Sequence, residues 1–200
     1  MMPVEYEHLL IFGSVMIATW FLAIYFWPCM LLSVYKRALL VKGFGDGPIP
    51  VNTLYTQPQK LFAEPITSQT ASSSNLMTVG VNHDTLSTAG WLDLSKGPLV
   101  LHVPEMNDRY YSLQFTDPLK NTNFAYIGTR TTGTQGSDYL ITRPGWKGQV
   151  PSSMKQISSP NKSVLVLGRV LVKSDSDVAT AYDLSKQIQL TPLSQWKPTQ

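Results

Sequence analysis

The stretch RYYSLQFT (residues 109–116) alternates between apolar and more polar side chains. Successive side chains of an extended strand point to opposite faces of a sheet. One face of this stretch would therefore carry the large apolar groups Tyr111, Leu113 and Phe115, and the other would carry Tyr110, Ser112 and Gln114. A period of two with one apolar face predicts a β-strand that is half-buried against a hydrophobic core.

Other segments on both sides of this stretch also have the composition of strands. They are rich in β-branched and aromatic residues and are separated by Gly, Pro, Asn and Asp, which favour turns. These segments are LVLHV (99–103), FAYIG (124–128), DYLIT (138–142) and SVLVLGRVLV (163–172). The last is apolar on both faces, which predicts a central strand. Several short strands at a spacing of roughly ten residues predict an antiparallel sandwich or barrel.

Short helices are expected to accompany the strands. Residues 56–65 have the features of a short helix, with Thr56 as a plausible N-cap. Over residues 177–190 the apolar positions change to helical spacing, and Asp175 or Asp177 could cap the start. The predicted fold is therefore mainly β, an antiparallel β-sandwich or jelly-roll-like domain with one or two short packing helices.

The segment LLIFGSVMIATWFLAIYFWPCMLLSVY (residues 9–35) contains no charged side chain. About 20 apolar residues suffice to cross the hydrocarbon core of a bilayer. A secretory signal peptide would have a basic start and a shorter apolar core, whereas here Glu5 and Glu7 precede the segment. We therefore predict an uncleaved transmembrane helix, which Pro28 could kink because proline removes one helical hydrogen bond. Gly13, Ser14 and Ala18 are small enough to let a partner helix approach closely, although contact with lipid alone would explain them equally.

The composition excludes several classes of function. The net charge is only +3, and no run of Lys and Arg occurs, which argues against nucleic acid as a partner. The single cysteine, Cys29, leaves no intrachain disulfide and no cysteine zinc site. The predicted layout is an N-terminal tail (1–8), the transmembrane helix (9–35), a linker (36–55), a β-rich soluble domain (56–196) and a short tail (197–200).

Asn82, His83 and Asp84 form the sharpest candidate for chemistry. A catalytic pair needs an imidazole oriented by a carboxylate, but neighbouring residues on a strand point to opposite faces. We therefore favour a turn, in which the Asp84 carboxylate accepts hydrogen bonds from the amides that follow it. His102, on a predicted strand, is interpreted as a surface or hydrogen-bonded histidine, and the histidines and acids of this region match no metal motif.

Two arginines are the other candidates for binding a ligand. Arg109 and Arg130 fall near one end of the predicted sheet, and with Tyr110 and Tyr139 they could bind a carboxylate or a sugar. The glycine-rich segment around Arg130 lacks the Lys-Ser/Thr pair and the following helix of a phosphate-binding loop, and no G-x-S-x-G nucleophile motif is present. The candidate ligand-binding residues are therefore Asn82, His83, Asp84, Arg109 and Arg130, with no catalytic residue, metal or cofactor predicted.

Several blocks of the sequence, taken in order, resemble the bacterial domain-of-unknown-function family DUF1254. The resemblance extends over roughly residues 50–195. At the turn it includes Asn82, Asp84, Thr85 and Leu86, and it departs at Ser87, where the family tends to have tyrosine. The blocks are VNTLYTQ (51–57), VNHDTLSTAGWLDLSKGPLVLHVPE (81–105), DRYYSLQF (108–115), TNFAYIGTRTTGTQGSDYLITRPGWKG (122–148), SPNKSVLVLGRVLV (159–172) and LSKQIQLTPLS (184–194).

The resemblance implies a β-sandwich-like, exported domain without a settled chemistry. Members of the family often carry a companion domain, DUF1214, on the same chain, which is not found in this sequence. This implies a partner subunit, which could be the companion made as a separate protein. The resemblance also favours the periplasmic side of a bacterial inner membrane, whereas Lys36, Arg37 and Lys42 after the span favour the cytoplasm; our prediction is the periplasm.

These observations lead to two hypotheses of different classes. The first is a single-pass, membrane-anchored, non-catalytic β-domain that acts as an accessory or scaffold subunit of a membrane complex, or that holds a partner subunit at the membrane surface. Its partners would be membrane lipid and other membrane-protein subunits. The alternative is a cell-envelope enzyme or ligand-binding protein that acts on a saccharide, lipid or small acid. The first hypothesis is the prediction.

Overall fold

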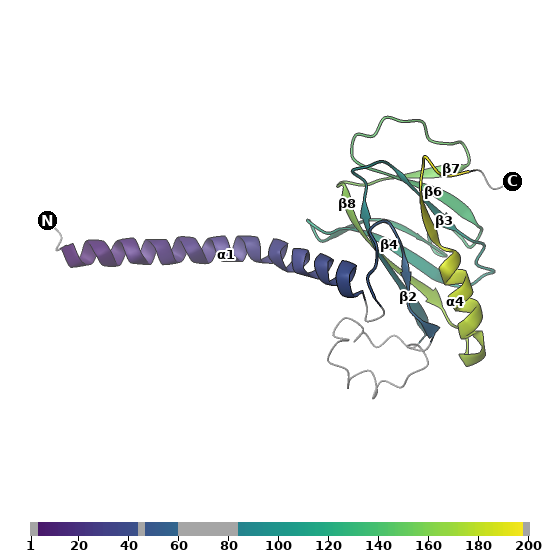
Figure 1. The fold of residues 1–200 in the computed structure, drawn as a ribbon, viewed down its shortest axis with the longest axis horizontal. Coiled ribbons are helices and arrows are strands. Elements are labelled where there is room, and N and C mark those ends of the chain that lie inside the picture. Colours follow the sequence, from purple (N-terminus) through teal and green to yellow (C-terminus); the bar gives the residue numbers. More distant parts are fainter. Residues whose placement is uncertain (1–3, 44–46, 60–83, 198–200) are drawn as a thin grey trace. The chain divides into compact units, whose positions relative to one another are not determined.

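The computed structural model describes residues 4–43, 47–59 and 84–197. The chain divides into two compact units, residues 1–38 and 39–200. The first unit consists of helix α1, which runs over Val4–Lys42 and so continues into the second unit. The second contains the β-rich domain and helix α4 (Figure 1).

Helix α1 is long and apolar enough to cross a membrane. It extends beyond the predicted span of residues 9–35 at both ends, passes through Pro28, and includes residues 36–42 of the predicted linker. The hydroxyl groups of Ser14, Thr19 and Ser33 each donate a 2.8 Å hydrogen bond to the carbonyl four residues earlier. These bonds satisfy the polar side chains within the helix, as a lipid environment requires. The helix is therefore compatible with a single-pass membrane anchor.

The β-rich domain contains two sheets, which confirms the predicted mainly β fold. The first sheet has the strand order β1-β2-β8-β4-β5, and its paired strands are all antiparallel. The second has the order β7-β6-β3-β9, and within it β7 runs parallel to β6. The bounds are β1 (Tyr55–Thr56), β2 (Thr85–Asp93), β3 (Leu99–Val103), β4 (Tyr111–Asp117), β5 (Thr122–Gly128), β6 (Ser137–Thr142), β7 (Met154–Ser158), β8 (Ser163–Leu171) and β9 (Gln189–Pro192).

The hydrophobic core lies between the two sheets. On β4, Tyr111, Leu113 and Phe115 are each at most 1% exposed, as their alternation predicts. Side chains of both sheets belong to the same buried cluster, for example Val166 of β8 and Leu101 of β3. The central position of β8 in its sheet agrees with the prediction from its apolar sequence. Because both sheets bury one face against the other, the arrangement is a β-sandwich.

Strand β2 was not among the strands predicted from the sequence. It pairs with β8 along its whole length, and both of its faces are largely buried. The segment before β1 continues the pairing along the edge of β2, since the Asn52 amide donates to the carbonyl of Trp91 (2.9 Å) and the Asn52 side chain binds the backbone of Asp93. A strand buried on both faces shows no alternation, which explains why the pattern does not reveal it.

The helical predictions are correct in part. Helix α4 (Val178–Gln187) follows a short 3-10 helix, η1 (Asp175–Asp177), and lies beside the sandwich (Figure 1). It ends three residues before the predicted end at residue 190, because Gln189 begins strand β9 at the edge of the second sheet. In the segment predicted as a helix over residues 56–65, Thr56 is instead in strand β1. Residues 60–65 lie outside the described part of the chain.

Candidate functional site

Arg109, predicted as a ligand-binding residue, forms a buried ion pair instead. It lies before β4 and is only 5% exposed. Its Nη1 donates to Asp177 Oδ2 (2.5 Å) and to the carbonyl of Leu171 (2.6 Å), and its Nη2 donates to Asp177 Oδ1 (2.7 Å). A guanidinium that is occupied in this bidentate manner is not available to a ligand. Arg109 therefore joins the start of β4 to the helical segment of the C-terminal region.

Asp177 is held in its charged form by the same contacts. Its pKa is lowered from 3.8 to about 2, chiefly by the hydrogen bonds from Arg109, while partial burial acts in the opposite direction. The amide of Lys173 also donates to Asp177 Oδ2 (2.8 Å). Asp177 occupies the N-cap position of α4, as predicted, but its side chain makes no capping hydrogen bond. The Asp177 carboxylate is directed to Arg109 instead.

Arg130 lies at the same end of the first sheet as Arg109 but has a different partner. Arg109 precedes β4 and Arg130 follows β5, and these two strand ends are paired. The hydroxyl of Thr129, next to Arg130, donates to the carbonyl of Arg109 (3.2 Å). Arg130 is exposed, and its guanidinium lies 5.7 Å from the ring centroid of Tyr110. Tyr139 is 2% exposed in the core. The structure thus places the arginines near one another without forming a common site.

The glycine-rich segment after β5 braces the sheet. The hydroxyl of Thr132 accepts a hydrogen bond from the amide of Gly128 (3.1 Å), and the hydroxyl of Tyr111 donates to the carbonyl of Gly133 (3.1 Å). The amide of Tyr111 in turn donates to the hydroxyl of Thr129 (3.0 Å). These contacts agree with the interpretation of this segment as a connection between strands.

The candidate turn before β2 is described only in part, because Asn82 and His83 lie outside the described residues. Asp84 is exposed, and its backbone carbonyl accepts a 2.7 Å hydrogen bond from the amide of Val172. This bond extends the pairing of β2 with β8 by one position. The role predicted for the Asp84 carboxylate, and the binding role of Asn82 and His83, stay predictions.

His102 is hydrogen-bonded on the outer face of the second sheet. Its Nδ1 lies 2.7 Å from Asp138 Oδ1, and the Nε1 of Trp196 donates to Asp138 Oδ2 (3.1 Å). Next to this group, Val100, Leu140 and Met154 form a small buried cluster, against which Trp146, Leu193 and Trp196 pack. The described residues contain no group of three or more His, Cys, Asp or Glu side chains that could hold a metal ion. The His102–Asp138 pair therefore reads as a polar contact that fixes the segment around Trp196.

A cleft that was not predicted from the sequence lies between β1, α4 and β9. Its volume is about 390 Å³. β1 and β9 are outermost strands of the first and second sheets, respectively, so the cleft occurs where the edges of the two sheets are near α4. The lining residues are Thr53, Leu54, Tyr55, Thr56, Tyr182, Lys186, Ile188, Gln189 and Leu190.

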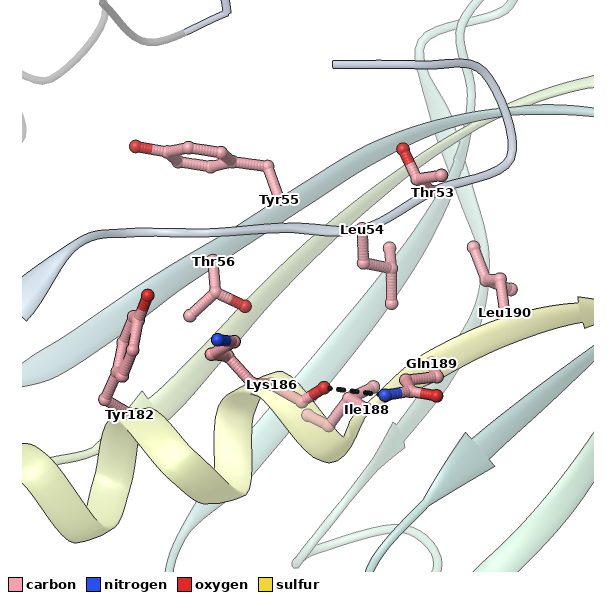
Figure 2. A pocket seen from close by; sticks show the side chains of 9 residues that line it. All are labelled: Thr53, Leu54, Tyr55, Thr56, Tyr182, Lys186, Ile188, Gln189 and Leu190. Atoms are coloured by element: carbon pink, nitrogen blue, oxygen red, sulfur yellow. Dashed lines mark hydrogen bonds between the residues drawn. The ribbon is translucent and has the colours of Figure 1, made fainter. Parts of the chain in front are cut away.

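The cleft has a polar end and an aliphatic end (Figure 2). Thr56, Tyr182 and Lys186 lie towards one end, and the ammonium of Lys186 is 5.4 Å from the ring centroid of Tyr182. The other, mainly aliphatic end is formed by Leu54, Ile188 and Leu190, with Thr53 and Gln189 beside Leu190. No local pattern could reveal this site, because its residues come from segments that are more than 100 positions apart in the sequence.

The three small residues proposed to contact a partner helix lie on α1. The hydroxyl of Ser14 donates within the helix to the carbonyl of Leu10, and a side chain at Gly13 would meet no atom within 4 Å. Ser14 and Ala18 are four positions apart, so they share one face of the helix. Contact of this face with another helix stays a prediction.

Comparisons with known proteins identify the family. No curated protein matches the chain. Among solved structures, the VPA0106 protein of Vibrio parahaemolyticus is similar at a TM-score of 0.62 and 25% identity, with 88% of this chain and 40% of that chain covered. An uncharacterized protein of Burkholderia cenocepacia is matched at a TM-score of 0.39 and 12% identity, over 60% of this chain and 31% of that chain. The model of DUF1254, a family of proteins of unknown function, matches residues 64–192, and the chain therefore belongs to this family.

Proposed function

We propose that this chain is a membrane-anchored, non-catalytic β-domain that serves as an accessory subunit of a membrane protein complex or holds a partner subunit at the membrane surface. The observation that carries the proposal is helix α1, which is long and apolar enough to cross a membrane and exposes large apolar side chains along its length. Because members of the family often carry the companion domain DUF1214, a protein with that domain is the first candidate for the partner. This chain spans 40% of the length of VPA0106.

Helix α1 supports the anchoring role. Large apolar side chains such as Phe12, Trp20 and Leu31 are about half or more exposed within the chain itself. Lipid or another apolar helix would remove this surface from water, which is favourable by roughly 25 cal/mol per Å² of apolar area. The small residues Ser14 and Ala18 would then allow a partner helix to pack closely.

The use of the polar residues in the β-domain supports a binding role rather than catalysis. Arg109 is committed to Asp177, and the exposed Arg130 lies against Tyr110. Asp138 accepts hydrogen bonds that fix its neighbours. Arg109 and Asp138 thus stabilise strand ends and a neighbouring segment, and this is the behaviour expected of a domain that presents a rigid surface.

The proposed location is the bacterial inner membrane, with the β-domain in the periplasm. A reporter fused to the C-terminus tests the orientation, since alkaline phosphatase is active only after export and green fluorescent protein folds in the cytoplasm. High phosphatase activity is expected. Fluorescence without phosphatase activity would instead agree with the positive charges of Lys36, Arg37 and Lys42.

Purification of the full-length chain from native membranes in a mild detergent tests the accessory role. We expect the chain to co-purify with a membrane protein at a fixed ratio. The double variant Ser14→Leu/Ala18→Leu should weaken the association, whereas Met16→Leu, on another face of α1, should not. Recovery of the wild-type chain as a monomer from native membranes would contradict the proposal.

The alternative function is a cell-envelope enzyme or a protein that binds a saccharide, lipid or small acid. One observation supports the binding of a small molecule. This observation is the cleft with Lys186 at its polar end. A ligand site there is compatible with an accessory subunit, because such a subunit can bind a small molecule without converting it.

A further inference from the structure

We propose that the cleft between β1, α4 and β9 binds a small amphiphilic carboxylate, that is, a short alkyl chain with one carboxylate group. The proposal goes beyond the accessory role, because it assigns a small-molecule ligand to a site that is formed within the β-domain. It depends on three properties of the cleft: the nature of its floor, the position of its one cation and its size.

The floor of the cleft is continuous with the hydrophobic core. Ile188 is 3% exposed and belongs to the core cluster. Leu54 and Leu190 are partly buried and pack against the same cluster. Because these three side chains pack against the hydrophobic core, they cannot turn into the cleft and fill it. They therefore present a fixed aliphatic surface. Such a surface suits the methylene groups of an alkyl chain, each of which contributes about 0.8 kcal/mol when it is buried.

The polar end of the cleft carries the positive charge of Lys186, which is not neutralised by a described neighbour. Lys186 is exposed at the last turn of α4, and no ion pair of its ammonium is found among the described residues. The ring of Tyr182 holds the ammonium in place by a cation–π contact. A carboxylate could bind this ammonium and accept further hydrogen bonds from the hydroxyl groups of Thr56 and Tyr182, which line the same cleft.

The shape of the site favours an amphiphile over a saccharide. Sugar rings bind against the open faces of aromatic side chains, but one face of Tyr182 is occupied by Lys186. In Figure 2, Tyr55 points away from α4, on the opposite side of β1 from Thr56. The far end is lined by the aliphatic side chains of Leu54, Ile188 and Leu190, with only Thr53 and Gln189 as polar groups beside them. The volume of about 390 Å³ falls within the range of roughly 300–1,000 Å³ that is usual for small-molecule sites.

Octanoate is a suitable probe, because it is short enough to stay largely in water. The full-length chain is placed in nanodiscs of a zwitterionic lipid, and binding is measured by saturation-transfer NMR. We expect saturable binding of octanoate that octyltrimethylammonium does not displace. Lys186→Met, which keeps the aliphatic stem, should weaken binding about tenfold, the loss typical of one charged contact. Lys186→Arg should retain binding within about threefold.

Controls separate a specific site from partition into the bilayer. Lys155→Met removes an exposed lysine of β7, far from the cleft in the sheet order, and should leave binding unchanged. Equal signals from wild type, Lys186→Met and empty nanodiscs would overturn the proposal, since they would show bilayer partition only. Competition by acetate as effective as that by octanoate would also overturn it, because the aliphatic floor would then have no role. Co-purification with a membrane partner is measured separately, so either proposal can fail without the other.

Discussion

The guanidinium of Arg109 holds the carboxylate of Asp177 through two hydrogen bonds of 2.5 and 2.7 Å, across 68 positions of the chain. The pair joins a residue two positions before β4 to the residue directly before α4. It also fixes the carbonyl of Leu171 at the end of β8, which accepts from the same guanidinium. This ion pair thus ties the start of α4 to the first sheet, and α4 in turn forms one wall of the cleft.

Replacement of Asp177 should destabilise the domain. Asp177→Asn leaves the buried guanidinium of Arg109 without a charged partner, and removal of one member of a buried pair typically costs about 3 kcal/mol or more. Urea unfolding of the full-length chain, followed by tryptophan fluorescence, measures the change. Asp175→Asn is the control, because Asp175 is exposed and should change stability by less than about 0.5 kcal/mol. Equal effects of the two variants would contradict the role of the pair.

Acid should weaken the same contact over a defined range of pH. Because the folded-state pKa of Asp177 is about 2 and the ordinary value is 3.8, the contribution of this group to stability is fully present above pH 3.8. It is lost as the pH falls towards and through about 2. The difference in unfolding free energy between wild type and Asp177→Asn should therefore shrink from pH 5 to pH 2. A difference that is independent of pH would show that another group is responsible.

A methyl group at Gly90 should separate β2 from the segment before β1. A Cβ atom at this position would lie 2.5 Å from the carbonyl oxygen of Thr53, which cannot move without the backbone. In Gly90→Ala we expect faster hydrogen exchange at the Asn52 amide, which normally donates to the carbonyl of Trp91. Gly168→Ala is the comparison, since its Cβ would first meet the flexible end of Leu113. That variant should lower stability by about 1–3 kcal/mol through overpacking while leaving exchange at Asn52 largely unchanged.

A charge in the middle of α1 should reduce its retention in the membrane. Arginine at the centre of a span is unfavourable by roughly 2.5–3.5 kcal/mol on insertion scales. Leu22→Arg should therefore increase the fraction of chain that is released from membranes by an alkaline wash. Val41→Arg, placed after the predicted span of residues 9–35, should behave like wild type. If Leu22→Arg is retained as firmly as wild type, α1 is not embedded as proposed.

The fold could be predicted from the sequence where burial affects only one face of a strand. The alternation in β4 and the turn residues around β3, β5 and β6 identified these strands to within about two residues at their ends. β2 was not predicted because both of its faces are largely buried. β7 was not predicted because its sequence, MKQIS, is mostly exposed and polar. The first two residues of β9 were included in the predicted helix over residues 177–190, since Ile188 also fits a helical spacing. The hydrogen bonds that β9 forms with β3 favour a strand over a helix for these residues.

The arrangement of the polar residues was less predictable than the strands. That Arg109 and Arg130 approach the same end of a sheet followed from the order of the strands. The contact between Arg109 and Asp177 could not be predicted in this way. The sequence contains several acidic residues, and only the packing of α4 brings one of them to Arg109. The cleft was missed for the same physical reason, since Thr56 and Lys186 meet only after both sheets have formed.

The pairing of β9 with β3 has a consequence for biogenesis. β3 is exposed on one edge until Gln189–Pro192 arrives, and Arg109 has no counter-ion until Asp177 has been translated. Domains that depend on such distant contacts fold slowly, and translation delivers the N-terminal helix first. The ribosome would thus release α1 to the insertion machinery while the sandwich is still incomplete. Nascent chains of this protein should therefore need protection by a chaperone until the last strand has been synthesised.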